Sequence, residues 1–456
     1  MNLLPTEVPE LITPEAPKAT YRFSRLGLLL ALGVITTCAV LVARTHSKPT
    51  KVKTAAVTPN RVLEIGARYA VGLKGFMQLV GSWNEALNAP ILKDLSKYQG
   101  GEEDALRLAI LRGWMSDQWP ADPNLTALAV TNEMLRNDLE TMHLLRDGKL
   151  PMTDPSWIKL KQRHGWMAQL ARVQALAVDD PERRALVKGG MRTALVCILA
   201  AMFGLLVFAL GLVVMFLAFS RWRAGSLTFT LKPVTKAEGG VMVEGFAIYL
   251  GLFLLAPTLL DFAPASALPW LRYAVGFVAL GCGLVWPIWR GMGACEWHFA
   301  LGLHRGKGWL REMHAGLLGW LAAVPILVLG MIAASWIADL TDVQPTHPIV
   351  DFFFGSPWVK WGAVLLAVIW APVSEELMFR GLLFPGLSAW LRWFLGISMS
   401  AFIFAVIHPQ GWAGVPAIMA LAAVFSLLRQ WRHSLIAPMT AHALNNGLIC
   451  LLILLM

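Results

Sequence analysis

The chain has 456 residues, of which 56% are hydrophobic and 15% are charged, and its mean hydropathy is +0.57. This composition excludes an ordinary soluble protein and indicates an integral membrane protein that crosses the bilayer several times. The formal net charge of +10 does not imply a nucleic-acid partner, because Lys and Arg are concentrated in loops between apolar runs, where they set membrane orientation.

The N-terminal part predicts a tail followed by a membrane anchor. Residues 1–25 are polar and contain four prolines, a composition typical of a disordered tail. Residues 26–43 form an apolar run that is just long enough to span a bilayer. Because the preceding tail is long and no small-x-small cleavage site follows, we interpret this run as an uncleaved anchor rather than a signal peptide.

Residues 45–190 differ in composition and predict a soluble helical domain. Charged residues return there, and Trp, Leu and Ala recur at helical spacing, which predicts helices at Glu102–Trp119 and Asn124–Arg146. Asp-Pro pairs beginning at Asp154 and Asp180 indicate two further helix starts, with Asp as the N-cap and Pro at the first helical position.

The remainder of the chain predicts a succession of membrane-spanning helices. Residues 193–220 are apolar throughout and carry no charge, so they predict a span that a basic loop follows. Further spans are expected at residues 241–260, 271–289, 316–338, 361–388, 394–408, 415–428 and 435–456. The expected fold is an all-α polytopic transmembrane bundle of about nine spans, with an inserted extramembrane helical domain.

The loops between these spans alternate in charge. Loops 221–240, 290–313 and 429–433 are rich in Lys and Arg, whereas loops 261–270, 339–359 and 409–414 are poor in them. The positive-inside rule places the first set in the cytoplasm. The N-terminus is then cytoplasmic and residues 45–190 are extracytoplasmic, which for a Gram-negative cell means the periplasmic side of the inner membrane.

The stretch that begins at Ser374 places three formal charges at the end of an apolar run that has none. Glu376 and Arg380 are four residues apart, so they share a helix face and can pair. Glu375 is rotated by about 100° from its neighbour and is left free, as expected of a general base. Taken alone, the stretch fits equally well a helix that has reached the interface, with its charges in water.

Two later spans favour a site within the membrane. His408 ends one apolar run, and His442 and Asn446 lie four residues apart on the last one. Glu375 and His408 are at similar distances from the turn between their helices, about 24 Å at 1.5 Å per residue. The four side chains can therefore meet at one depth, in a pocket lined by protein or filled with water.

The ordered motifs EExxxR, FxxxH and HxxxN resemble those of the CPBP family of intramembrane endopeptidases, which includes the CAAX prenyl proteases and bacteriocin-processing, Abi-like proteins. The resemblance rests on Glu375–Arg380, Phe404–His408 and His442–Asn446, and nothing before about residue 190 takes part in it. It implies a membrane-associated protein or peptide as the substrate.

The expected domains follow from these patterns. They are a disordered tail (1–25), a transmembrane anchor (26–43), a soluble helical domain (45–190), a transmembrane helix with a basic loop (191–240) and a CPBP-like protease core (241–456).

Geometry and resemblance together imply peptide hydrolysis by an activated water molecule. Glu375 would accept a proton from water that His408 helps to hold, and His442 and Asn446 would donate hydrogen bonds to the developing oxyanion. No Ser, Cys or Thr nucleophile stands at these positions, so no covalent intermediate is expected. The supporting residues are Glu376, Arg380 and Phe404.

A metal-dependent mechanism is the alternative. Glu375, His408 and His442 together supply the three ligands of a catalytic zinc site. The HExxH signature is absent, so a mechanism without a metal or other cofactor is preferred.

Two other classes of function remain open. Polar residues on consecutive spans also mark ion pathways in transporters, although no inverted repeat is visible. A non-catalytic receptor or immunity protein could use the same fold. Because every motif position holds a chemically competent residue, catalysis is favoured, and proteolysis that depends on Glu375 would separate the three classes.

Overall fold

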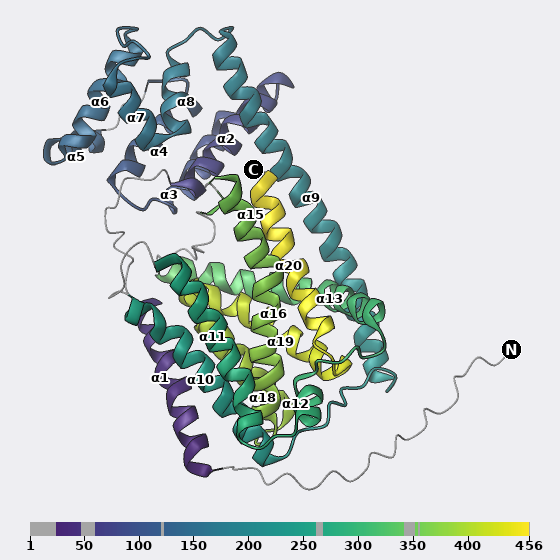
Figure 1. Ribbon diagram of the computed structural model, residues 1–456. Helices are drawn as coiled ribbons and strands as arrows, with labels where there is room; N and C mark the ends of the chain where they lie inside the picture. Colours follow the sequence, from purple (N-terminus) through teal and green to yellow (C-terminus); the bar gives the residue numbers. More distant parts are fainter. Residues whose placement is uncertain are drawn as a thin grey trace. The chain divides into compact units, whose positions relative to one another are not determined.

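The computed structural model describes residues 24–46, 60–119, 123–260, 268–341, 352–353 and 356–455 (Figure 1). Throughout these ranges the regular elements are helices, and no strand occurs in them. The expected all-α polytopic bundle is therefore confirmed. All but the last two residues of the predicted N-terminal tail lie outside the described ranges.

Among the described residues, seven helices are long and apolar enough to cross a membrane. Their bounds are Arg25–Arg44, Pro181–Arg223, Lys236–Leu254, Trp309–Thr341, Pro357–Ser388, Gly411–Arg432 and Ile436–Leu455. The two other predicted spans correspond to shorter apolar helices, Ala274–Trp289 and Trp393–Val406. All nine predicted spans are thus helical, and among the described residues seven of them meet both the length and the hydropathy of a membrane span.

The chain divides into two compact units, and each combines segments that are distant in sequence. The first contains residues 1–47, 211–334 and 364–447, and the second contains residues 48–210, 335–363 and 448–456. Four helices cross these boundaries: α9 (Pro181–Arg223), α13 (Trp309–Thr341), α15 (Pro357–Leu365) and α20 (Ile436–Leu455).

The remaining elements of the first unit are α1 (Arg25–His46), α10 (Lys236–Leu260), α11 (Leu268–Trp289), α12 (Ala294–Leu301), η2 (Leu366–Trp370), α16 (Ala371–Glu376), η3 (Leu377–Leu383), α17 (Phe384–Ser388), α18 (Trp393–Val406) and α19 (Gly411–Arg432). Aromatic side chains link three of them at the centre of the unit. The Phe379 ring lies 5.0 Å from that of Phe246 and 4.8 Å from that of Phe404, edge to face in both cases. These two ring contacts pack η3 against α10 and α18.

The span Pro357–Ser388 contains two π-helical segments, η2 and η3. Each ends two residues before a proline, Pro372 or Pro385. A proline lacks the N–H of the usual i→i−4 bond and its ring clashes with that carbonyl, so the preceding turn widens. Accordingly, Ala371 N–H bonds to Leu366 O, five residues back. Such bulges are frequent at functional sites, and this pair flanks Glu375 and Glu376.

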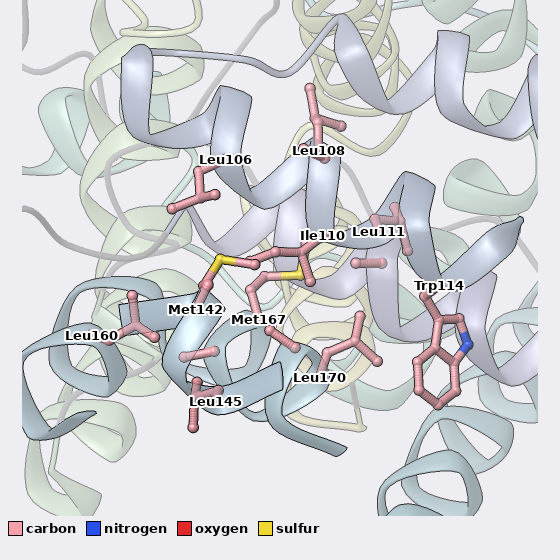
Figure 2. Close-up of a cluster of buried hydrophobic side chains, with 14 of the residues drawn as sticks. Leu106, Leu108, Ile110, Leu111, Trp114, Met142, Leu145, Leu160, Met167 and Leu170 are labelled. Atoms are coloured by element: carbon pink, nitrogen blue, oxygen red, sulfur yellow. The ribbon is translucent and has the colours of Figure 1, made fainter. Parts of the chain in front are cut away.

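The second unit contains α2 (Arg61–Leu79), η1 (Glu85–Leu87), α3 (Asn88–Ser96), α4 (Glu102–Met115), α5 (Pro123–Thr131), α6 (Glu133–Arg146), α7 (Pro155–His164) and α8 (Trp166–Gln174). Side chains of α4 and α6–α8, among them Ile110, Met142, Leu160 and Met167, form its hydrophobic core (Figure 2). The predicted N-caps are confirmed, because Asp154 accepts from Ser156 N–H and Asp180 from Glu182 N–H, both at 2.8 Å.

Two helix limits differ from the predictions. The single helix expected at Asn124–Arg146 is wrong, because the Asn132 side chain accepts from Leu135 N–H at 3.0 Å and caps the start of α6. The helix expected to reach Trp119 ends at Met115. In addition, α9 is continuous from Pro181, so residue 190, where the soluble domain was expected to end, lies inside a helix.

A group of ionisable side chains is buried inside the α2–α8 domain. The Asp138 carboxylate accepts from Arg163 Nε at 3.0 Å, and His164 Nε2 lies 3.0 Å from the same oxygen. Burial, together with the positive charges of Arg107 and Arg163, lowers the pKa of His164 to about 3. The Asp138 charge is already balanced by Arg163, so burial decides that the His164 ring is neutral.

Candidate active site

Glu376 is the fully buried centre of a polar cluster in the first unit. Its Oε1 accepts from Arg380 Nη1 at 3.0 Å and from His442 Nδ1 at 2.9 Å. The ion pair predicted from the four-residue spacing of Glu376 and Arg380 is therefore present. The same carboxylate also joins α16 to α20, two elements 66 positions apart in sequence.

Arg380 is equally buried, and aromatic rings surround it. Its guanidinium carbon lies 4.8 Å from the centre of the Phe404 ring and 5.2 Å from that of Phe425. Its Nη2 donates to Ala422 O at 2.8 Å. A buried cation needs a counter-charge and hydrogen-bond acceptors, and Glu376, the Ala422 carbonyl and the two ring faces supply them.

Glu375 lies beside this cluster and differs from its neighbour in exposure and partners. Its side chain is 24% exposed, and Oε2 lies 3.8 Å from His408 Nε2 and 3.9 Å from His442 Nε2. Both separations exceed hydrogen-bond length, and Oε2 is buried without a hydrogen-bond partner among the described residues. The carboxylate is therefore poised between two imidazole rings without being bonded to either.

The tautomers of the two rings follow from their other nitrogens. His408 Nδ1 lies 2.5 Å from Phe404 O, and a carbonyl can only accept, so Nδ1 carries the proton. His442 Nδ1 faces the Glu376 carboxylate and is protonated for the same reason. In the neutral rings each Nε2 is then a bare acceptor. Three acceptors thus converge on one space, which suits a donor of two protons, such as water.

Phe404 explains the FxxxH motif. Its carbonyl fixes the His408 tautomer, its ring centre lies 4.2 Å from that of His408, and the same ring covers the Arg380 guanidinium. Phe425 has the matching role at His442, with the rings stacked at 5.0 Å. Sequence reasoning missed Phe425, because α19 carries no polar motif that would mark its place.

Asn446 is oriented by the π-helical segment η2. Its Nδ2 donates to Ala367 O at 2.9 Å. In an i→i+5 series this carbonyl would need the N–H of residue 372, which is a proline, so Asn446 supplies the missing donor. One N–H of the amide is occupied in this way, and the second remains for a ligand.

The donors predicted as the zinc alternative lie close together, and whether they bind a metal stays a prediction. In the part of the chain that the structure describes, no group of three or more His, Cys, Asp and Glu could hold a metal ion. Glu375, His408 and His442 are of the right chemical type, but their facing atoms are 3.8 and 3.9 Å apart. Sequence reasoning identified the three side chains that converge, and the structure shows their spacing.

The first unit thus holds a carboxylate and two imidazole rings that converge within a helical membrane bundle. Residues 357–448 match the family described as type II CAAX prenyl endopeptidase, Rce1-like. The matched segment includes every residue predicted for the site and confirms the resemblance drawn from the three motifs. The family is one of proteases, which supports peptidase activity. No curated protein and no solved structure matches the chain.

Proposed function

We propose that this chain is an intramembrane endopeptidase that hydrolyses a peptide bond in a membrane-associated protein or peptide. The observation that carries the proposal is the convergence of His408 Nε2 and His442 Nε2 on Glu375 Oε2, within 4 Å in both cases. The family match of residues 357–448 supports the same conclusion.

Water activation follows from the acceptors. A water molecule between them donates one proton towards Glu375 and the other towards His408 Nε2. As the water oxygen attacks the substrate carbonyl, Glu375 takes its proton, and the protonated carboxyl then delivers it to the leaving amine nitrogen as the C–N bond breaks. The carboxylate ends the cycle in its starting state.

The oxyanion that forms in this attack needs donors. Asn446 offers its second N–H, and its first N–H on Ala367 O holds the amide in place. His442 donates only when its Nε2 carries a proton, and the hydrogen bond between Nδ1 and Glu376 holds the ring with Nε2 towards Glu375.

A covalent route has little support. Ser374 is the hydroxyl next to the carboxylates, and its Oγ donates to Trp370 O at 2.8 Å within its own helix. It is thus occupied and turned to the backbone, whereas a nucleophile must face a base. Direct attack by water is the mechanism that the arrangement favours.

We place the protein in the bacterial inner membrane, with the N-terminus in the cytoplasm and residues 45–190 outside. Contacts among the three basic loops support a common side for them. Gln430 Nε2 donates to Phe229 O at 3.4 Å, and Arg432 donates to both oxygens of Glu312 at 2.8 and 2.7 Å. By the positive-inside rule that side is cytoplasmic.

The test compares the parent protein with Glu375→Gln in proteoliposomes and in cells. Glu375→Gln preserves shape and removes basicity, so cleavage should fall by at least about 10²-fold, and uncut membrane peptides should accumulate. Glu140→Gln, a change at an exposed helix position, is the matched control and should cleave normally. Normal cleavage by purified, folded Glu375→Gln protein would contradict the proposal.

A further inference from the structure

Two adjoining pockets lie where three helices of the first unit end. The larger has a volume of about 630 Å³ and lies between α9, α13 and α19. Apart from Arg221 and Ser226 its lining is apolar, with Phe219, Ala322 and Leu427 as examples. Its volume is typical of a ligand site, and its lining suits hydrocarbon.

The smaller pocket, of about 370 Å³, has basic residues in its lining, although most of its surface is apolar. Lys307, Arg311 and His314 line it on one side and Arg432 on another, and it shares Leu318 and Trp431 with the larger pocket. The two pockets therefore adjoin, and we call them together the joint pocket. Its larger part is the apolar compartment, and its smaller part is called the cationic compartment after the basic residues in its lining.

The charge of the cationic compartment is not balanced locally. Glu312 lies next to it, but this carboxylate is fully buried and both its oxygens accept from Arg432, at 2.8 and 2.7 Å. Among the described residues, no acidic side chain pairs with Lys307 or Arg311, and both are exposed. Two cations are thus free to bind an anion.

We propose that the joint pocket binds an anionic phospholipid of the surrounding membrane. An acyl chain would fill the apolar compartment, and the phosphate would bind Lys307 and Arg311. Basic pockets between membrane helices recognise anionic headgroups in this way. Trp431, which lies at the junction of the compartments, suits the boundary between tail and headgroup, because indole rings favour that depth. A water-soluble anion would leave the apolar compartment without an occupant.

The site is separate from the proposed catalytic one. Of the three helices, α9 and α13 lie wholly outside the matched segment 357–448, and none of the predicted catalytic residues lines either pocket. Bound lipid would contact all three helices at once, and a ligand that binds only the folded state stabilises it. The proposal does not depend on peptidase activity.

The test measures lipid retained by the purified full-length protein. The delipidated protein is incubated with mixed micelles of phosphatidylglycerol and phosphatidylcholine, and native mass spectrometry then counts each bound lipid. The parent should retain phosphatidylglycerol in preference. Lys307→Gln/Arg311→Gln should lower that preference about tenfold or more, because each basic residue contributes to anionic-lipid binding. Arg223→Gln/Arg305→Gln, which removes the same charge near the same helix ends but outside the joint pocket, should keep it.

Ala322→Trp tests the apolar compartment, and Ala322→Leu is the milder form. Both should lower the amount of either lipid retained, while thermal unfolding in detergent without added lipid stays at the parental temperature. Equal retention of the two lipids by the parent would overturn the proposal. So would an equal loss in the control double variant, or full retention by folded Ala322→Trp, since surface charge alone would then account for binding.

Discussion

His442 Nδ1 and Glu376 Oε1 form a buried hydrogen bond of 2.9 Å that joins the first and last helices of the site. The same oxygen accepts from Arg380 Nη1 at 3.0 Å. One carboxylate therefore neutralises a buried cation and at the same time fixes the tautomer of a ring whose other nitrogen faces Glu375. The EE pair thus separates into a buried organiser, Glu376, and a partly exposed base, Glu375.

The first prediction follows from this separation. Glu376→Gln leaves Arg380 buried without a counter-charge, which costs about 3–5 kcal/mol when one member of a buried pair is removed. We expect a clearly lower unfolding temperature in detergent together with lost activity, whereas Glu375→Gln should lose activity at a parental unfolding temperature. The double variant Glu376→Gln/Arg380→Met should regain stability without activity. If Glu376→Gln unfolds like the parent, the organising role is wrong.

The second prediction concerns metal. If Glu375, His408 and His442 act on water directly, active protein should contain far less than one zinc per chain, and strong chelators should leave turnover unchanged. If they ligate zinc, elemental analysis should find about one zinc per chain, and its removal should abolish turnover. His408→Ala serves as the control, because it removes one of the proposed zinc ligands. If this variant still contains one zinc per chain, the zinc is bound at another site. One zinc that is required for activity would overturn the metal-free mechanism.

The composition and the hydrophobic patterning were sufficient to predict the bundle, because in a membrane every span must be an apolar helix that satisfies its own backbone. The site could be predicted for a related reason. Ionisable residues are costly in a span, so Glu375, His408 and His442 stood out. The sequence could not predict how aromatic rings and backbone carbonyls position the site residues. Phe425 and the Ala367 carbonyl have no feature that distinguishes them from the rest of an apolar helix.

Helix limits in the α2–α8 domain were harder to predict than the spans. Hydrophobic periodicity continues across Asn132, and only the hydrogen bond from Leu135 N–H to its side chain shows that one helix ends and another begins there. The π-helical segments were likewise not predicted. Pro372 and Pro385 mark their places, but a proline in a helix can equally produce a kink.

The third prediction separates Asn446 from His408. Asn446→Ala removes a donor that acts mainly on the transition state, so the rate should fall by about 10²–10³ with little change in substrate binding. The limbs of its pH profile should stay in place, because an amide does not titrate. His408→Ala removes a group that holds water and should also remove or move one limb. Rate against pH on one fluorogenic peptide in detergent measures both.

Asn445→Ala is the matched control for that experiment, since Asn445 contacts the Asn446 amide at 3.3 Å but not Ala367. It should cleave close to the parental rate. Cleavage by Asn446→Ala at the parental rate would exclude the oxyanion role. The amide would then serve only as the hydrogen-bond donor to the Ala367 carbonyl. In that case its loss should appear as a stability cost of about 1–3 kcal/mol for an unpaired buried acceptor.

The fourth prediction concerns the pH dependence of stability in the α2–α8 domain. Burial and the arginines Arg107 and Arg163 lower the pKa of His164 from 6.5 to about 3, although the negative charges of Glu103 and Asp104 oppose this and Asp138 faces Nε2. Between these values the unfolded chain binds a proton that the folded domain excludes. Stability must therefore fall as pH falls below 6.5, by up to about 1.4 kcal/mol per pH unit, and must be insensitive to His164 above it.

His164→Gln should remove this part of the slope, since a glutamine amide donates to Asp138 without titrating. The measurement is hydrogen exchange of α2–α8 peptides in the full-length protein between pH 7 and pH 4, corrected for the intrinsic exchange rate. His143→Gln, at an exposed position of α6, should retain the parental slope. Parallel slopes for the parent and His164→Gln would mean that His164 is protonated in the folded domain and paired with Asp138.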